Sequence, residues 1–297
     1  MDERRDSDSD QSRSRAGRGT RSGAGKPGRP VRARDRYLPG IISVVSVLVV
    51  FLVARQAVVS AEQWPRIRRQ FFNFEAIVEV FPEVLGGFGI NMAVWAVALV
   101  VIALWALLLA VFRALSGPWF APLRVFTVVY IDLLRGLPSL LVVLLFGFGV
   151  PALQIPGLPQ SRLFWGGIAL VLTYAAYAAE VYRSGMEAVH EGQRAAAKAL
   201  GLSQWQTLRY AIIPQAVRNV LPSLLNLAVA LQKDVALLSV IGVRDAVREA
   251  QIYTARTFNY SSLIAAAVLF LAATIPLARF TDYVSRKDRE RRLQGAL

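Results

Sequence analysis

Long apolar segments separated by short charged segments constrain this chain more than any other feature of its sequence. The apolar segments lie at about 38–59, 84–112, 123–150, 163–182, 217–241 and 260–284. A helix needs about 20 mainly apolar residues to cross the hydrocarbon core of a bilayer, and each segment meets that length. Apolar residues make up 55% of the 297 residues, more than the roughly 45–50% typical of soluble domains. The sequence therefore predicts an all-α polytopic membrane protein with six transmembrane helices.

The net charge of +14 is concentrated at the two ends of the chain and between the apolar segments. Lys and Arg are retained on the cytoplasmic side of a membrane, so this distribution favours orientation signals over nucleic-acid binding. With a cytoplasmic N-terminus, six spans place the C-terminus and residues 183–216 in the cytoplasm. Residues 60–83 and 242–259 are then extracytoplasmic. We expect a multi-pass protein of the plasma membrane.

The segments outside the spans differ in composition. Residues 1–36 lack large apolar side chains and are predicted to form a disordered basic cytoplasmic tail, which also suits contact with anionic membrane lipid. Residues 38–59 are expected to be an extra N-terminal transmembrane helix; a cleaved signal peptide is the alternative and would leave five spans. Residues 60–83 are predicted to be an extracytoplasmic interfacial segment. Residues 285–297 form a second basic cytoplasmic tail.

Several kinds of chemistry are excluded by residue counts. The chain has no cysteine and one histidine, His190, so it offers neither disulfides nor a multi-histidine metal site. None of its four lysines completes a GxxxxGK[ST] phosphate-binding loop. The sequence therefore predicts no catalytic site, no metal site and no cofactor or ATP site of its own.

The polar segment between the fourth and fifth spans is the most informative part of the sequence. Residues Met186 to Leu200 are expected to form a short helix with small residues on one side, terminated by Gly201. Ser203 and Gln206 have the spacing of a capping box, so a second helix should begin there and stop before Pro214. Small exposed side chains let the surface of another protein approach the backbone. A membrane-interface connector without a partner is the alternative.

Three motifs in this region and beyond resemble the permease subunits of binding-protein-dependent ABC importers. The match is closest to the polar amino-acid branch, which imports histidine, glutamine, glutamate and arginine. The resemblance extends over residues 84–284, and the loop motif is specific. The motifs are Ala-Tyr-x-Ala-Glu-x-x-Arg-x-Gly at 176–185, followed by Gly192-Gln193, Ala196-Ala197, Ala199 to Ser203 and Ile213 to Ala216; Tyr130 to Pro138; and Leu231 to Gly242.

The resemblance implies an architecture and a set of partners. It implies a five-helix type I permease core at 84–284, with a coupling loop at 186–214 that contains a cytoplasmic coupling helix. The implied partners are a cytoplasmic ABC ATPase dimer, which binds ATP and Mg²⁺, a second permease subunit and an extracytoplasmic amino-acid-binding protein. A homodimer and a heterodimer are both open. The candidate ATPase-coupling residues are Glu191, Gly192, Gln193, Ala195, Ala196, Ala197, Ala199, Leu200, Gly201 and Pro214.

Some positions depart from the family pattern. Ala195 stands where the family has the glutamate of its Glu-Ala-Ala signature, which helps to secure the loop to the ATPase. Glu191 lies one helical turn earlier on the same face, and we hypothesise that it partly substitutes; unchanged transport after charge reversal at Glu191 would exclude this. Leu137 replaces a family threonine, and Val235 and Ala236 replace Thr-Ser. These changes make the expected pathway more apolar.

Charged residues inside the spans need a partner or water, because each costs about 2.5–3.5 kcal/mol on insertion scales. Asp132 and Arg135 are spaced to pair on one helix, as are Glu180 and Arg183, and either pair can be purely structural. A helix break beside charged residues is a common arrangement in transporters. The candidate residues of the translocation pathway or gate are Arg135, Pro138, Lys233 and Asp234.

The expected function is a transmembrane permease subunit that moves polar amino acids into the cytoplasm, driven by ATP hydrolysis in a partner subunit. Two alternatives are a secondary active transporter of small polar solutes and a membrane scaffold protein. The first would need no ATPase-docking loop, and the second gives no reason for the order of the motifs. The sequence leaves open whether the substrate is glutamate, glutamine or a basic amino acid.

Overall fold

The computed structural model describes residues 33–60, 62–189 and 191–294, without the side chains at 33–39, 57–58, 191, 194, 198 and 291–294. These residues contain helices and no strand. The predicted tail at 1–36 lies outside them except for residues 33–36, which begin helix α1 (Ala33–Val59). The predicted C-terminal tail continues helix α12 (Ser261–Gln294) as far as Gln294. The chain divides into two units, Met1–Ala61 and Glu62–Leu297.

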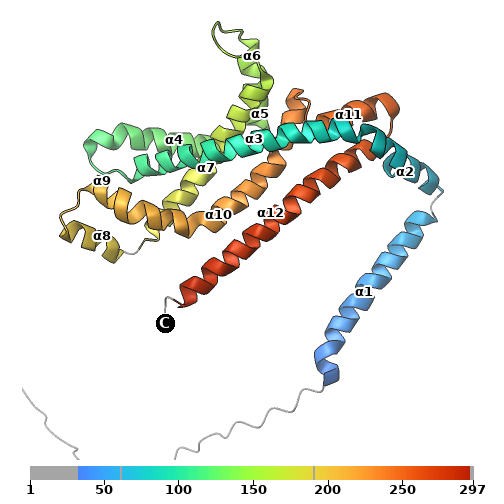
Figure 1. Cartoon of the computed structure of the whole chain (residues 1–297), viewed down its shortest axis with the longest axis horizontal. Coiled ribbons are helices and arrows are strands. Elements are labelled where there is room, and N and C mark those ends of the chain that lie inside the picture. Colours follow the sequence, from blue (N-terminus) through green and yellow to red (C-terminus); the bar gives the residue numbers. More distant parts are fainter. Residues whose placement is uncertain (1–32, 61, 190, 295–297) are drawn as a thin grey trace, which may run out of the picture. The chain divides into compact units, whose positions relative to one another are not determined.

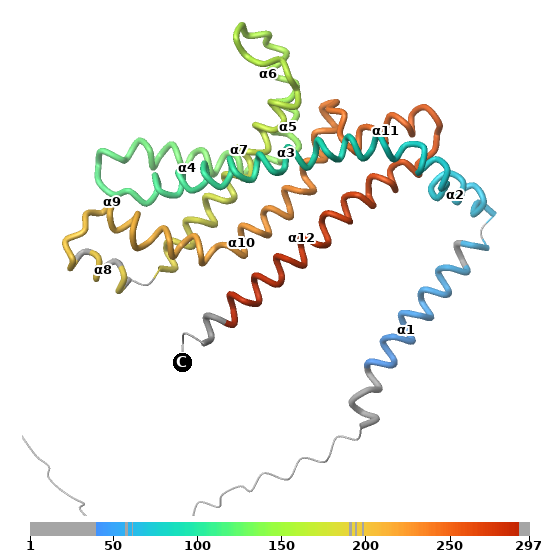
Figure 2. The backbone as a smooth tube through the Cα atoms, viewed as in Figure 1, coloured from blue at the N-terminus to red at the C-terminus, as the bar shows by residue number. Residues whose placement is uncertain are grey.

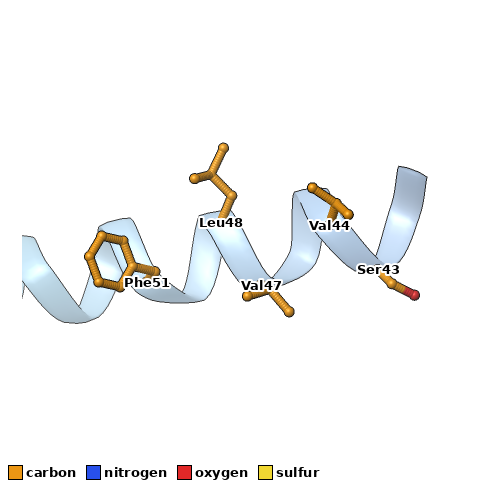
Figure 3. A pocket seen from close by; sticks show the side chains of 5 residues that line it. All are labelled: Ser43, Val44, Val47, Leu48 and Phe51. Atoms are coloured by element: carbon orange, nitrogen blue, oxygen red, sulfur yellow. The ribbon is translucent and has the colours of Figure 1, made fainter. Parts of the chain in front are cut away.

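The first unit contains α1, which is apolar on all sides. Its side chains stand away from the helix axis, as Figure 3 shows for Val44, Val47, Leu48 and Phe51. Each of these four side chains is more than half exposed. Within the described side chains of α1, the apolar stretch Gly40–Gln56 is shorter than the about 20 residues of an average span. The sixth transmembrane helix therefore stays a prediction.

The second unit supplies the long helices. Among the described residues, four helical stretches are long and apolar enough to cross a membrane, or five when a bent pair of helices is counted as one span. The fold is thus helical and suited to a membrane because a backbone in hydrocarbon must satisfy its polar groups internally. The four stretches are Trp64–Ala114, Arg162–Glu187, Gln204–Ile241 and Ser261–Glu290.

The segment before the second predicted span is also helical. Helix α2 (Trp64–Phe71) has exposed arginines and half-buried Trp64 and Ile67, an amphipathic pattern that suits an interfacial position. Helix α3 (Phe74–Ala114) begins ten residues before the predicted start at 84. The Asn73 side chain caps it by accepting hydrogen bonds from the backbone N–H groups of Glu75 and Ala76. The cap, rather than the apolar pattern, decides where this helix starts.

The bent pair divides the third predicted span. Helix α4 (Ala121–Gly136) follows a short 3₁₀ turn, η1 (Pro118–Phe120), and α5 (Ser139–Leu144) continues through the π-helical η2 (Leu145–Gly149) into α6 (Val150–Ala152). The two halves meet at an angle of 103°. Figure 2 shows α5 and α6 turning away from α3 and α4. The break falls at Leu137 and Pro138, where proline disfavours a helical conformation of the residue before it.

The core lies where α3, α7 (Arg162–Glu187) and α10 (Ile213–Asp234) pack together (Figure 1). Helix α7 packs between α3 and α10, and small side chains on its surface allow both to approach closely. Ala175, Ala176 and Ala179 of α7 are fully buried. A Cβ atom added at Gly185 of α7 would lie 2.3 Å from the Val220 side chain of α10. Small residues thus permit close helix packing, which drives association inside a membrane where the hydrophobic effect is weak.

Helix α10 leads into the extracytoplasmic end of the predicted topology. It passes through the 3₁₀ segment η4 (Val235–Ile241) to α11 (Ala246–Thr257) and then α12. Helix α11 packs against α3 and α12, and α12 also packs along α10. A second, smaller hydrophobic cluster joins α3, α11 and α12 around Val80, Val84 and Ala250. The predicted extracytoplasmic segment 242–259 is therefore mostly a helix held on α3.

Candidate functional site

The polar segment at 186–214 folds as two short helices in series. Helix α7 ends at Glu187, and α8 spans Glu191–Ala199. The expected single helix over Met186–Leu200 is therefore wrong at its start, because α7 continues into it and is followed by a break. Gly201 adopts a positive φ of 74°, which confirms it as the terminator of α8. Such a conformation favours glycine.

The second short helix begins as predicted and ends differently. Ser203 and Gln206 form the capping box of α9 (Gln204–Thr207). The prediction that this helix stops before Pro214 is wrong, because the chain continues through the π-helical η3 (Leu208–Ile212) directly into α10. Pro214 lies in the first turn of α10, where a missing N–H leaves no hydrogen bond unmade. The fifth span and the polar segment therefore share one helical stretch.

One face of α8 carries only small side chains. Gly192, Ala195, Ala196 and Ala199 are exposed, whereas Ala197 on the opposite side is buried. At 100° per residue the four exposed positions lie within about a third of the helix circumference. Of the other candidate residues, Gln193, Leu200, Gly201 and Pro214 are exposed, and the side chain of Glu191 and all of His190 lie outside the described residues. The four small side chains thus form one exposed face of α8, with buried Ala197 behind it.

Large exposed apolar side chains follow α8 in the chain; Leu200 was a candidate from the sequence, whereas Trp205 and Tyr210 were not singled out. Leu200 is 80% exposed, Tyr210 66% and Trp205 50%. Exposed aromatic side chains beside a face of small residues are typical of protein interfaces, in which Trp and Tyr are enriched. The composition of the segment at 200–210 contained this signal, because it places Trp205 and Tyr210 in an otherwise polar segment.

A charged cluster lies where α3 and α7 end on the same side. Glu180 accepts hydrogen bonds from Arg113 of α3, at 3.0 Å, and from Arg183. Arg183 also pairs with Glu187. The predicted pairing of Glu180 with Arg183 is confirmed, but the pairing of Glu180 with Arg113 joins residues 67 positions apart and has no sequence signal. A cavity of about 280 Å³ lies beside the cluster, lined by Ala110, Arg113, Ala114, Arg183, Met186 and Glu187.

The other predicted charge pair does not form. Within the described residues, Asp132 and Arg135 make no ion pair with each other or elsewhere, and both are exposed. The Arg135 guanidinium instead lies 5.8 Å from the ring centre of Tyr177 on α7, a cation–π distance. The spacing allowed an ion pair, but the tertiary structure offers Arg135 an aromatic ring.

The candidate pathway residues of α10 have different surroundings. Tyr174 of α7 donates a 2.8 Å hydrogen bond to the Asp234 carboxylate. Lys233 is exposed and makes no ion pair within the described residues. The neighbouring Gln232 is 1% exposed; its side-chain oxygen accepts from Thr274, while its amide nitrogen has no partner in the described part of the chain. This junction of α7, α10 and α12 is thus polar although it lies in the core.

Two tyrosines of α7 connect the candidate pathway residues. Tyr174 and Tyr177 have ring centres 6.4 Å apart. Tyr174 contacts Asp234, and Tyr177 contacts Arg135, so α7 links the last turn of α4 to the end of α10. Tyr174 also lines a small apolar cavity of about 60 Å³ between α3, α7 and α10. Neither tyrosine was predicted as a site residue, because contacts between helices are not encoded in local spacing.

A buried polar junction fixes α11 to α3. Asp245 is fully buried and caps α11 by accepting from the Arg248 backbone N–H at 2.8 Å. Asn91 of α3 donates to the Asp245 carboxylate at 3.1 Å and accepts from the Ala246 backbone N–H at 3.2 Å. Burial raises the pKa of Asp245 above its ordinary value, and the donated hydrogen bonds oppose this change. The described residues hold no cluster of three or more metal-ligating side chains.

Together the long apolar helices and the bent pair define a polytopic helical membrane protein, with an exposed face of small side chains on α8. Residues 114–290 match the family model of the binding-protein-dependent transport system inner membrane component. The chain belongs to this family. The predicted resemblance is thereby confirmed.

Relatives named as amino-acid permeases match over nearly their whole length. The glutamate/aspartate import permease protein GltK of Escherichia coli O6:H1 is 31% identical over 222 residues, which cover 73% of this chain and 98% of that protein. The probable amino-acid ABC transporter permease protein YckA of Bacillus subtilis is 33% identical, over 77% of this chain and 97% of that protein. The arginine transport system permease protein ArtQ of the same organism is 30% identical, over 72% of this chain and 96% of that protein.

Solved structures agree on the fold. The crystal structure of an amino acid ABC transporter with histidines superposes with a TM-score of 0.64 at 30% identity, over 72% of this chain and 98% of that chain. The methionine ABC transporter MetNI in an inward-facing conformation superposes with a TM-score of 0.57 at 14% identity, which supports the fold alone. These relatives are transporter subunits, and the fold class of an ABC permease follows for this chain.

Proposed function

We propose that this chain is the permease subunit of an ATP-driven importer that moves a polar amino acid into the cytoplasm. The observation that carries the proposal is the exposed small-residue face of α8, formed by Gly192, Ala195, Ala196 and Ala199. A cytoplasmic ABC ATPase dimer docks on this face and holds the ATP and Mg²⁺; this chain binds neither. The named substrates of the relatives, glutamate, aspartate and arginine, support a polar amino acid as cargo.

The mechanism follows from the position of α8 between two spans. Closure of the ATPases upon ATP binding moves α8, and the motion reaches α7 on one side and the α9–α10 stretch on the other. The pathway between this chain and a second permease subunit, identical or similar, then opens to the extracytoplasmic side. An extracytoplasmic binding protein delivers the amino acid there. Both chain ends lie in the cytoplasm, and α1 is an additional span outside the shared core.

The coupling assignment predicts a specific loss of the ATPase. Gly201→Lys places a long charged side chain beside the α8 face. It also forces lysine into the positive φ of 74° that Gly201 adopts, which is strained for a residue with a Cβ atom. We expect the amount of ATPase subunit that co-purifies with the tagged chain in mild detergent to fall at least about tenfold, equivalent to about 1.4 kcal/mol of binding. The measurement is quantitative mass spectrometry of the tagged chain isolated from its native membrane.

A matched control is available in the same chain. Gly157 also has a positive φ, of 87°, and open space around it, but it lies in the loop between α6 and α7. Gly157→Lys should retain the ATPase at the wild-type level. Recovery of the wild-type chain without any ATPase in several detergents would contradict the importer and favour a secondary transporter or a scaffold.

We propose further that Asp234, with Lys233, Arg135 and Pro138, lies at the translocation pathway. The polar junction around Asp234 and the bend at Pro138 support this placement, since an unpaired charge in a span requires polar surroundings. Asp234→Asn should lower the uptake of labelled amino acid about tenfold without loss of the ATPase. The amide oxygen of that variant can still accept from Tyr174, so it tests the charge, whereas Tyr174→Phe removes the hydrogen bond but keeps the carboxylate charge and should retain most of the uptake. Equal losses in both variants would assign Asp234 a structural role.

A further inference from the structure

The turn between α3 and η1, Ala114–Gly117, is hydrogen-bonded to several elements. Gln204, the first residue of α9, makes two of them. Its side-chain oxygen accepts from the Ser116 hydroxyl at 2.8 Å, and its side-chain nitrogen donates to the Ala114 carbonyl at 3.3 Å. These residues are 88 and 90 positions away in the sequence. The amide of Gln204 therefore connects the segment after α8 directly to the end of α3.

The same turn is also held by its own helices. Arg124 of α4 donates to the carbonyls of Leu115, at 2.8 Å, and Gly117, at 2.9 Å. Immediately before this turn, Arg113 of α3 pairs with Glu180 of α7. The last carbonyl groups of a helix have no partner within the helix and need donors from elsewhere. Here those donors come from α4 and α9, so a displacement of the turn moves the ends of α3 and α4 together.

The start of α9 is rigid enough to transmit a displacement. The capping box of Ser203 and Gln206 fixes its first turn. Thr207 and Leu208, which follow, are buried. Only the left-handed Gly201 and three further residues separate α9 from α8. A movement of α8 therefore reaches Gln204 over a short and well-ordered connection.

We propose that Gln204 is a positioning residue that passes the movement of α8 to the Ala114–Gly117 turn, and through it to α3 and α4. This inference rests on the proposed docking of an ATPase at α8. It gives the coupling segment a second connection to the membrane helices, apart from its covalent continuity with α7 and α10. The hydrogen bonds of Gln204 convert a local displacement of the loop into a joint movement of two spans.

The test compares two exposed glutamines of the chain. Gln204→Ala removes both bonds to the turn, whereas Gln160→Ala removes only a bond to the Leu158 carbonyl in the loop between α6 and α7 and leaves the turn and α9 untouched. In cells whose own copy of the chain is replaced by the variant, we measure uptake of labelled glutamate, glutamine and arginine, each offered separately. Uptake is divided by the ATP hydrolysis of the purified complex. We expect Gln204→Ala to lower this ratio about fivefold with the ATPase retained, and Gln160→Ala to change it less than twofold.

A conservative variant and a cross-link sharpen the result. Gln204→Glu can still accept from Ser116 but cannot donate to Ala114, so an intermediate ratio is expected. Because the chain has no cysteine, the double variant Ser116→Cys, Gln204→Cys can be joined selectively with a short thiol cross-linker. Joining the two positions should restore the ratio lost in the unlinked double variant.

The outcomes separate this inference from the proposed function. An unchanged ratio in Gln204→Ala, with the ATPase still bound, would overturn the role of Gln204 and leave the importer assignment intact. A further loss of uptake on cross-linking would also overturn it, because the contact would then have to open during transport. Absence of the ATPase from the wild-type complex would instead overturn the proposed function itself.

Discussion

Gly87→Ala is expected to destabilise the second unit by about 3 kcal/mol, the upper part of the range for overpacked cores. A Cβ atom at this position of α3 would lie 2.5 Å from the Asp245 carbonyl carbon and 2.6 Å from the Ala246 backbone nitrogen. Both are backbone atoms and cannot be relieved by a rotamer change. We expect the apparent melting temperature in detergent to fall by several degrees.

The polar junction of α11 adds to this effect. Asn91 lies one helical turn after Gly87 on the same face of α3 and makes its hydrogen bonds to Asp245 and Ala246. A methyl group at Gly87 therefore pushes α11 away from Asn91 and leaves buried polar groups without partners, which costs about 1–3 kcal/mol for each group. Packing and hydrogen bonding thus act in the same direction.

The neighbouring glycine is the control for Gly87. Gly86 lies on the same helix with no atom within 4 Å of an added Cβ. Gly86→Ala should leave the melting temperature unchanged or raise it slightly, because alanine is the better helix former. Equal melting temperatures for the two variants would mean that α11 does not pack on α3 as closely as described.

Glu180→Gln has the second largest expected effect. It should lower the free energy of unfolding by about 2 kcal/mol. Removing this carboxylate leaves Arg113 and Arg183 without their shared partner at the ends of α3 and α7. Breaking a fully buried pair costs about 3–5 kcal/mol. The three side chains are between 23% and 32% exposed, so water compensates part of that loss.

Glu187→Gln provides the comparison for Glu180. Glu187 pairs with Arg183 as well, but its side chain is 63% exposed, and exposed pairs contribute about 0.2–1 kcal/mol. The unfolding midpoints of both variants, each with and without Arg113→Leu, give the coupling energy in a double-mutant cycle. Similar midpoints for Glu180→Gln and Glu187→Gln would exclude the linkage of α3 to α7 through Glu180.

Local signals in the sequence predicted the elements of the candidate site well. The left-handed Gly201 and the capping box of Ser203 and Gln206 are determined by residues within four positions of each other, so neighbours in sequence are sufficient. The rule that a helix stops before proline failed at Pro214. Proline is excluded from helix interiors but accepted in a first turn, and only the preceding π-helical turn makes Pro214 a first-turn residue.

Charge pairing shows the limit of local reasoning. Spacing alone allowed both Glu180–Arg183 and Asp132–Arg135, yet only the first pair forms. Helical spacing permits a contact, whereas the neighbouring helices decide which partner is used. Arg113 of α3 pairs with Glu180 of α7, and the ring of Tyr177 on α7 contacts Arg135 of α4.

The sequence by itself determined that this chain is a helical membrane protein with an exposed, small-residue segment between two spans. Long apolar runs must form helices in hydrocarbon, because their backbone groups have no other partners there. The tertiary structure alone decided the 103° bend, the junction of Asn91 with Asp245 and the contact of Gln204 with the Ala114–Gly117 turn. Each of the two contacts joins residues far apart in the sequence, and the faces that two helices present to each other depend on the packing of the whole unit.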